Sequence, residues 1–206
     1  TAHPGDIIGV TGPVACGKST LGCVFLSERP YGGSMRIGGK ELKDFAPREI
    51  AETISIPVLR KDFTVNSYMI YQAKLLGAAA ILLICAILDD EQLVDYLKLA
   101  DSLGLDALVE AHDAEEVARA LNAGAQIIGV NNRDLKTFEV DVRNSIRLRE
   151  LAPKEVLFVS ESGIKTSEDI RKLYENEVDA VLIGETLMRS DDKKKALETL
   201  NGEALK

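Results

Sequence analysis

The chain has 206 residues, of which 46% are hydrophobic and 28% charged, and its formal net charge is -8. This composition supports a buried core and excludes a fibrous or disordered chain. With 25 Lys and Arg against 33 Asp and Glu, the sequence offers no basic face, so nucleic acid is not expected as a partner.

Two further features predict a cytoplasmic protein. No basic stretch followed by an apolar one opens the chain, and the most apolar run, residues 77–88, is shorter than the roughly 20 residues that span a bilayer. Cys16, Cys23 and Cys85 show no C-x-x-C spacing. We therefore expect a reduced compartment, no membrane contact, no disulfide and no metal site.

A glycine-rich motif follows the first predicted strand, residues 6–10. The next residues, Gly12 to Ser19, match the phosphate-loop pattern G-x-x-x-x-G-K-[ST], and a predicted helix follows them. In such a loop, glycines expose backbone N–H groups to phosphate, the lysine reaches the outer phosphates and the hydroxyl can hold magnesium. The candidate nucleotide-binding residues are Gly12, Gly17, Lys18, Ser19 and Thr20.

The rest of the first segment predicts a short strand or hairpin over residues 32–42 and a helix that begins near Pro47. Residues 1–55 resemble the start of the nucleotide-binding domain of an ABC transporter, in which a G-S-x-x-I-x-G strand follows the phosphate loop. No strand ending in Asp-Glu, no Leu-Ser-Gly-Gly-Gln signature and no switch histidine follow in the sequence. This segment therefore predicts nucleotide binding without the groups for hydrolysis.

From residue 56 onward, strands and helices alternate at the spacing of βα units. Six apolar runs predict strands, at residues 58–59, 81–85, 107–109, 127–130, 156–159 and 180–183. Between them, amphipathic stretches predict helices at residues 91–103, 114–123, 145–151 and 167–174.

Polar residues follow most of these predicted strands. Because parallel strands with helical crossovers end at one edge, residues that are far apart in sequence should converge there, as in a (βα) barrel. The strand ends carry Lys61, Glu110, Asn131, Glu161, Ser162, Gly163, Gly184, Glu185 and Thr186. The sequence thus predicts an α/β fold with a shared site at the carboxyl ends of its strands.

Five motifs resemble indole-3-glycerol phosphate synthase, in the order and spacing of that family. They are Pro57-Val-Leu-Arg-Lys-Asp-Phe63, Leu108-Val-Glu-Ala-His112, Ile128-Gly-Val-Asn-Asn-Arg-Asp-Leu-Lys-Thr-Phe138, Val159-Ser-Glu-Ser-Gly-Ile164 and Val181-Leu-Ile-Gly-Glu-Thr-Leu-Met188. The resemblance covers residues 56–206. It implies an eight-stranded TIM-type (βα)8 barrel and a lyase of tryptophan biosynthesis, which closes the indole ring of a carboxyphenylamino-deoxyribulose phosphate with loss of carbon dioxide and water.

The resemblance also implies roles for individual residues. Lys61 matches the general acid that protonates the ketose carbonyl, Glu110 a second proton-transfer group, and Asn131 a polar contact that orients the substrate. Glu161 and Ser162 match residues that line the site from the next strand. The expected phosphate-binding positions are Gly163, Gly184, Glu185 and Thr186, and the expected partner is a phosphorylated small molecule, with no cofactor.

The two segments together predict a chimera. The family carries two strands before the Lys61 strand, the first with a Glu-x-Lys-x-x-Ser-Pro-Ser pattern, and here the phosphate-loop segment stands in their place, which predicts impaired turnover. The alternatives are a nucleotide-binding module that acts through its phosphate loop, or a non-catalytic scaffold. His112, next to Asp113, is interpreted as a helix-start residue rather than a metal ligand, and Cys85 as a small buried residue.

Overall fold

The computed structural model describes residues 57–133, 137 and 139–202, together with positions 36–37, 39–41, 44–45 and 49. The predicted phosphate loop, Gly12 to Thr20, and nearly all of the helix predicted near Pro47 lie outside the described residues. The predicted boundary at residue 55 and the replacement of two βα units by a phosphate-loop segment therefore stay predictions.

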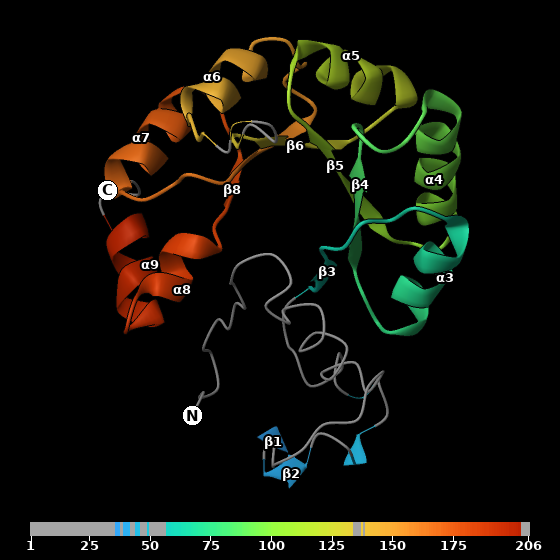
Figure 1. The fold of residues 1–206 in the computed structure, drawn as a ribbon, viewed down its shortest axis with the longest axis horizontal. Coiled ribbons are helices and arrows are strands. Elements are labelled where there is room, and N and C mark those ends of the chain that lie inside the picture. Colours follow the sequence, from blue (N-terminus) through green and yellow to red (C-terminus); the bar gives the residue numbers. More distant parts are fainter. Residues whose placement is uncertain are drawn as a thin grey trace. The chain divides into compact units, whose positions relative to one another are not determined.

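The described strands alternate with helices along the chain (Figure 1). The strands are β1 (Arg36–Ile37), β2 (Lys40–Glu41), β3 (Leu59–Arg60), β4 (Ala80–Ile84), β5 (Asp106–Ala111), β6 (Ile127–Asn131), β7 (Leu157–Glu161) and β8 (Ala180–Leu182). The helices are α3 (Ser67–Leu75), α4 (Asp90–Ser102), α5 (Ala114–Ala123), α6 (Arg143–Arg149), α7 (Ser167–Glu175), α8 (Glu185–Arg189) and α9 (Lys193–Asn201).

Strands β3 to β8 are hydrogen-bonded neighbours in chain order. The pairs β3–β4, β5–β6, β6–β7 and β7–β8 are parallel. Sequential parallel strands joined by helices are the topology of a (βα) barrel, so the predicted α/β class is confirmed. Strands β1 and β2 form a separate antiparallel pair, which confirms the hairpin expected within residues 32–42.

The chain divides into two compact units, which are described separately. One comprises residues 12–82 and 95–107, and the other residues 1–11, 83–94 and 108–206. In the described part of the first unit, Asn66 caps the start of α3, and its side chain accepts a hydrogen bond from the Met69 N–H. Ile70 and Ala73 on α3 are fully buried, whereas Tyr68, Tyr71 and Leu75 are exposed.

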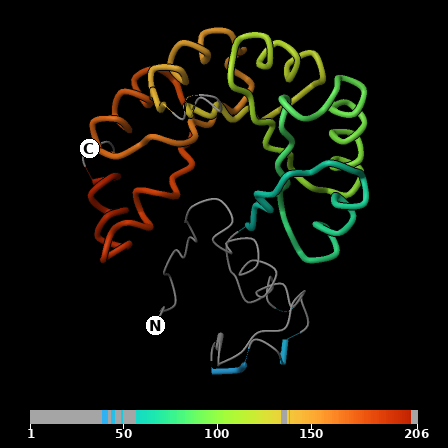
Figure 2. The backbone as a smooth tube through the Cα atoms, in the orientation of Figure 1, coloured from blue at the N-terminus to red at the C-terminus, as the bar shows by residue number. Residues whose placement is uncertain are grey.

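In the second unit, helices α5, α6 and α7 lie along the outer side of β5 to β8 (Figure 1), and the trace passes from strand to helix and back (Figure 2). Its core contains Val109, Val117, Ile128, Phe158 and Leu173, each at most 1% exposed. Local signals set the ends of two helices. Asp113 caps the start of α5, and Thr166 and Asp169 form a reciprocal capping box at the start of α7.

All six strands predicted beyond residue 56 are present, as are the four predicted helices, with boundary differences of a few residues. Helices α3, α8 and α9 were not predicted. Among the described residues, no helix has both the length and the apolar character needed to cross a membrane.

Candidate active site

Two buried acids lie at the carboxyl ends of β5 and β7. Glu110 is 5% exposed and Glu161 is 1% exposed. The strand between them, β6, pairs Gly129 with Glu110 on one side and Asn131 with Glu161 on the other. The predicted convergence of strand-end residues is therefore observed for these strands, because the parallel register places their polar ends at one edge of the sheet.

Gly129 provides the space for the Glu161 side chain. A Cβ atom at position 129 would lie 2.1 Å from Glu161 Oε1 and 3.0 Å from Leu108 Cδ1. A glycine inside a strand often marks such a close approach. The absence of a side chain on β6 thus allows the Glu161 carboxylate to lie across the strand.

Glu110, His112 and Glu116 form a group that we call the carboxylate–imidazole cluster. Glu116 Oε2 lies 3.0 Å from His112 Nδ1, and on the other side of the ring Nε2 lies 3.4 Å from Glu110 Oε1. Asn131 Nδ2 donates to the same Glu110 oxygen at 3.1 Å. These contacts bring two strand ends and the first turn of α5 together around one carboxyl group, an arrangement suited to moving protons.

Hydrogen bonding to Glu116 raises the pKa of His112 above its ordinary value. Burial of the ring acts in the opposite direction, and the charges of Glu116, Glu110 and Glu161 add to the increase. Within the described part of the chain, no group of His, Cys, Asp or Glu side chains has the arrangement of a metal site. His112 lies just before the Asp113 cap of α5, close to the helix start expected from the sequence.

Asn132, Ser145 and Ser160 form a second, uncharged group, the hydroxyl–amide cluster. All three are buried. Asn132 Oδ1 accepts from the backbone N–H and the hydroxyl of Ser145, at 3.0 and 2.7 Å, and its Nδ2 donates to Ser160 Oγ at 2.9 Å. The same Nδ2 donates to the backbone oxygen of Ser162 at 3.0 Å. The cluster therefore ties the end of β6 to α6 and to the turn after β7.

The turn after β7 has an unusual backbone. Ser162 and Gly163 have positive φ values of 66° and 81°. A Cβ atom at position 163 would lie 2.2 Å from Val140 Cγ1, so glycine is required there. The left-handed Ser162 costs energy, and the bond from Asn132 to its carbonyl helps to hold it.

The turns after β7 and β8 are joined by a hydrogen bond. Thr186 Oγ1 donates to the backbone oxygen of Ile164 at 2.5 Å. Glu185 contacts Arg133 at 3.2 Å and Arg189 at 2.9 Å. Its side-chain charge is thus offset by two guanidinium groups.

The remaining predicted catalytic residue, Lys61, follows β3 in the other unit and is exposed. Its neighbour Arg60 serves the local structure, because it donates to the Met69 carbonyl at 2.9 Å and to Gln72 at 2.8 Å on α3. Cys85 is 1% exposed, and burial is the main cause that raises the pKa of its thiol to about 12. The interpretation of Cys85 as a small buried residue is confirmed.

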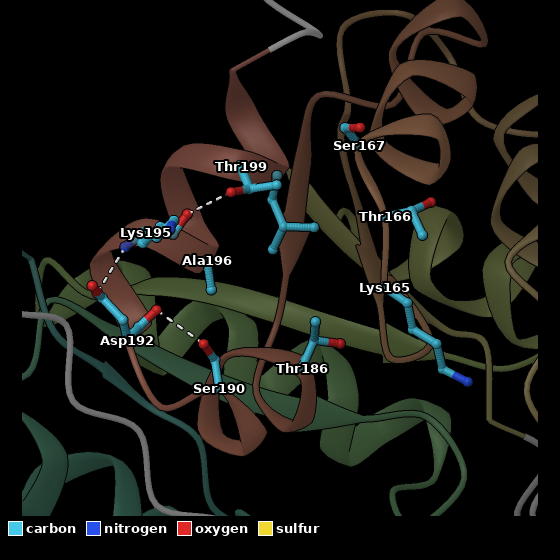
Figure 3. Close-up of a pocket in the computed structure, with 10 residues that line it drawn as sticks. Lys165, Thr166, Ser167, Thr186, Ser190, Asp192, Lys195, Ala196 and Thr199 are labelled. Carbon is cyan, nitrogen blue, oxygen red and sulfur yellow. Dashed lines mark hydrogen bonds between the residues drawn. The ribbon is translucent and has the colours of Figure 1, made fainter.

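A pocket of about 480 Å³ lies among α7, α8 and α9 (Figure 3). Its polar lining includes Lys165, Thr166, Thr186 and Lys195. Thr186 is the one predicted phosphate-binding residue in this lining, and none of the buried acids contributes to it. Apart from Thr186, the residues that line the pocket lie outside the predicted strand-end site.

Several site residues were not singled out from the sequence. They are Gly129, Glu116, Asn132, Ser145 and Ser160. A glycine within an apolar strand and the paired Asn131-Asn132 after it were visible signals. The two serines gave none, because a small hydroxyl side chain does not reveal from sequence which distant residue it will contact.

The comparisons with known sequences agree on one family. The family model described as indole-3-glycerol phosphate synthase matches residues 43–200. The indole-3-glycerol phosphate synthase of Ruminiclostridium cellulolyticum is 59% identical over 157 residues, which cover 76% of this chain and 60% of that protein. The indole-3-glycerol phosphate synthase of Lachnoclostridium phytofermentans is 57% identical over 158 residues, which cover 77% of this chain and 58% of that protein. The chain thus spans about three fifths of the length of these relatives.

Solved structures show the same kind of fold at low identity. The 3-hexulose-6-phosphate synthase of Salmonella typhimurium is 16% identical with a TM-score of 0.61, covering 72% of this chain and 73% of its own. A mandelate oxidase is 17% identical with a TM-score of 0.61, covering 76% of this chain and 59% of its own. At such identities the similarity concerns the fold alone.

Proposed function

Because the chain belongs to the indole-3-glycerol phosphate synthase family, we propose that it is a carboxy-lyase that acts on 1-(2-carboxyphenylamino)-1-deoxyribulose 5-phosphate. The ring carbon that carries the carboxylate attacks the ketose carbonyl carbon. Carbon dioxide leaves as the new carbon–carbon bond forms, and the resulting hydroxyl group leaves as water. The product is an indole that retains the glycerol phosphate chain, as in tryptophan biosynthesis.

The proposal rests on the polar side chains that lie at the ends of β5, β6 and β7. Glu110 and Glu161 are buried acids, and Asn131 donates a hydrogen bond to Glu110. A buried acid in contact with an imidazole and an amide is suited to exchange protons near neutral pH. In the proposed reaction Glu110 moves a proton during dehydration, Asn131 orients the substrate, and Glu161 and Ser162 line the site.

Lys61 is the proposed general acid. An ammonium group can protonate the ketose carbonyl and attract the departing carboxylate by its charge. The assignment rests on the family motif from Pro57 to Phe63 and on the position of Lys61 directly after β3.

The substrate phosphate is proposed to bind the turns after β7 and β8. Gly163, in the left-handed conformation after β7, and Gly184 and Thr186, at the start of α8, offer backbone N–H groups to the anion. The bond from Thr186 to the Ile164 carbonyl joins these two turns. Glu185 contributes its backbone, since its carboxylate is engaged by Arg133 and Arg189.

Turnover of this substrate, followed by indole fluorescence, tests the proposal. We expect the native chain to form product and Lys61→Ala to lose about 100-fold or more in kcat, the usual effect of removing a general acid. Lys98→Ala, which removes an exposed lysine on α4, is the matched control and should keep the native rate. A folded native chain without turnover, or a Lys61→Ala variant with the native rate, contradicts the assignment.

Nucleotide binding at Gly12 to Thr20 is a second candidate, supported by the complete match to the phosphate-loop pattern. We expect ATP with magnesium to raise the melting temperature of the native chain, and Lys18→Ala to abolish that increase. An increase that persists in Lys18→Ala would assign the nucleotide to another site. The absence of any increase in the native chain would contradict nucleotide binding.

A further inference from the structure

His112 is held by contacts to both its backbone and its ring. Its backbone N–H donates to Glu116 Oε2 at 2.8 Å, and its carbonyl accepts from Asn144 Nδ2 at 3.0 Å. The ring nitrogen Nδ1 lies 3.0 Å from the same Glu116 oxygen. Helices α5 and α6 thus fix the residue, and the side chain is only 15% exposed.

The Glu116 carboxylate determines which ring nitrogen of His112 carries the proton. An ionised carboxylate only accepts hydrogen bonds, so the short contact with Glu116 requires the proton of the neutral ring to be on Nδ1. The second nitrogen, Nε2, then lies 3.4 Å from Glu110 Oε1. Nε2 is buried and makes no hydrogen bond with the described residues. Buried polar atoms of this kind require an explanation.

A proton between Nε2 and Glu110 provides that explanation. Two acceptors that face each other are unfavourable, so a proton must lie on Nε2 or on the carboxyl group. The titratable groups around the ring are Glu116 from α5, Glu110 on β5 and Glu161 from β7, while α6 presents the uncharged Asn144. Three carboxyl groups around one imidazole favour its positively charged form.

We propose that His112 is a positioning residue for Glu110, in which the ring, held by Glu116, presents Nε2 to Glu110 Oε1 and shares one proton with it. The two residues then titrate as a pair. Catalytic contacts are often long in the free protein, so we expect the 3.4 Å separation to shorten when substrate fills the site. This inference rests on the proposed function, in which Glu110 is the proton-transfer group.

NMR titration of the His112 ring in the full chain tests proton sharing without turnover. The sequence contains only two histidines, His3 and His112, so His112→Gln identifies the signal. In the native chain the pKa of His112 should lie above its ordinary value of 6.5. Both Glu110→Gln and Glu116→Gln should lower it, because each removes a neighbouring negative charge and preserves the size of the side chain.

Glu115→Gln is the matched control, since Glu115 also lies in the first turn of α5 but is exposed. It should leave the titration of His112 unchanged. Proton sharing is contradicted if Glu110→Gln has no effect on the pKa of His112, or if Glu115→Gln lowers it as much as Glu116→Gln does. If replacing exposed acids in general lowers the pKa of His112, the effect is one of overall charge and proton sharing is contradicted.

The pH dependence of turnover tests the positioning role. We expect His112→Gln to lower kcat by about tenfold with KM unchanged, the effect of losing one hydrogen bond to a charged group. The acidic limb of the profile should move to higher pH, because Glu110 loses a nearby positive charge. A profile identical to that of the native chain overturns the role. If the native chain shows no turnover, the proposed function fails, while the NMR titration still decides whether the proton is shared.

Discussion

The carboxylate–imidazole cluster and the hydroxyl–amide cluster differ in how completely their polar atoms are paired. In the hydroxyl–amide cluster, Asn132 makes bonds to Ser145, Ser160 and the Ser162 carbonyl, and none of its members titrates near neutral pH. In the carboxylate–imidazole cluster, His112 Nε2 is buried at 3.4 Å from a carboxylate, and every member can gain or lose a proton.

This difference indicates different contributions to the protein. A fully paired neutral cluster stabilises one backbone arrangement, because breaking any bond leaves a buried polar group. An incompletely paired charged cluster has a protonation state that depends on pH and on bound molecules. We therefore expect changes in the hydroxyl–amide cluster to reduce stability. Changes around the carboxylate–imidazole cluster should reduce activity or alter its pH dependence.

Gly129→Ala should have the largest effect and should act on activity. The new Cβ would lie 2.1 Å from Glu161 Oε1, so the carboxylate must move, whereas the flexible end of that side chain can yield at little cost to stability. We expect turnover to fall about 100-fold, the cost of misplacing a catalytic group by about 1 Å. Steady-state kinetics and urea denaturation measure the two effects.

A double-mutant cycle shows whether Glu161 is the cause. In a Glu161→Ala background, Gly129→Ala should produce no further loss of activity, because the displaced carboxylate is already absent. An additional 100-fold loss in that background would instead indicate that β6 itself is distorted.

Asn132→Ala should reduce stability. It removes four hydrogen bonds and leaves Ser145 N–H and the Ser162 carbonyl without their partner, so we expect the free energy of unfolding to fall by about 2 to 3 kcal/mol. Urea denaturation measures the change. Asn176→Ala, at the exposed end of α7, is the control and should cost about 1 kcal/mol or less. Equal losses in the two variants would contradict the structural role of the hydroxyl–amide cluster.

His112→Gln should change how stability depends on pH. The folded-state pKa of His112 is raised, so its contribution is fully present below the ordinary value of 6.5 and is lost as pH rises through the raised folded value. Urea denaturation should show the free energy of unfolding of the native chain falling as pH rises through this range. His112→Gln should lack that fall. Asn132→Ala should retain the native slope, since it removes no titratable group.

Asp169→Asn, outside both clusters, should have the smallest effect. Burial acts to raise the pKa of Asp169, but hydrogen bonds from Lys165 and Thr166 outweigh it and lower that pKa. We expect a loss of about 1 kcal/mol at neutral pH from weakening the capping box of α7.

Because the folded-state pKa of Asp169 is depressed, its stabilisation is present above the ordinary value of 3.8 and is lost as pH falls through the folded value. Denaturation at neutral and acidic pH should therefore show the native chain and Asp169→Asn converging in acid. Glu168→Gln, in the same turn but exposed, should change stability by less than about 1 kcal/mol.

Elements with strong local signals were predictable from the sequence. Residues 114–123 were predicted as a helix from apolar residues that repeat on one face, and α5 has the same bounds. In the structure Asp113 caps its start and Gly124 ends it in the left-handed conformation. Helix α3 was not predicted. Its apolar residues Tyr68, Tyr71 and Leu75 remain exposed while Ile70 is buried, so no single apolar face was visible in the sequence.

The sequence by itself determined the α/β class, the chain order of the six strands and the polar residues that end them, because periodicity and turn residues act over a few positions. Only the tertiary structure decided which of these residues meet. Asn132 contacts Ser160 across 28 positions, Asn131 contacts Glu110 across 21, and Gly129 makes room for Glu161 on the neighbouring strand. Such contacts depend on strand register and side-chain direction, which are set by the packing of the whole unit.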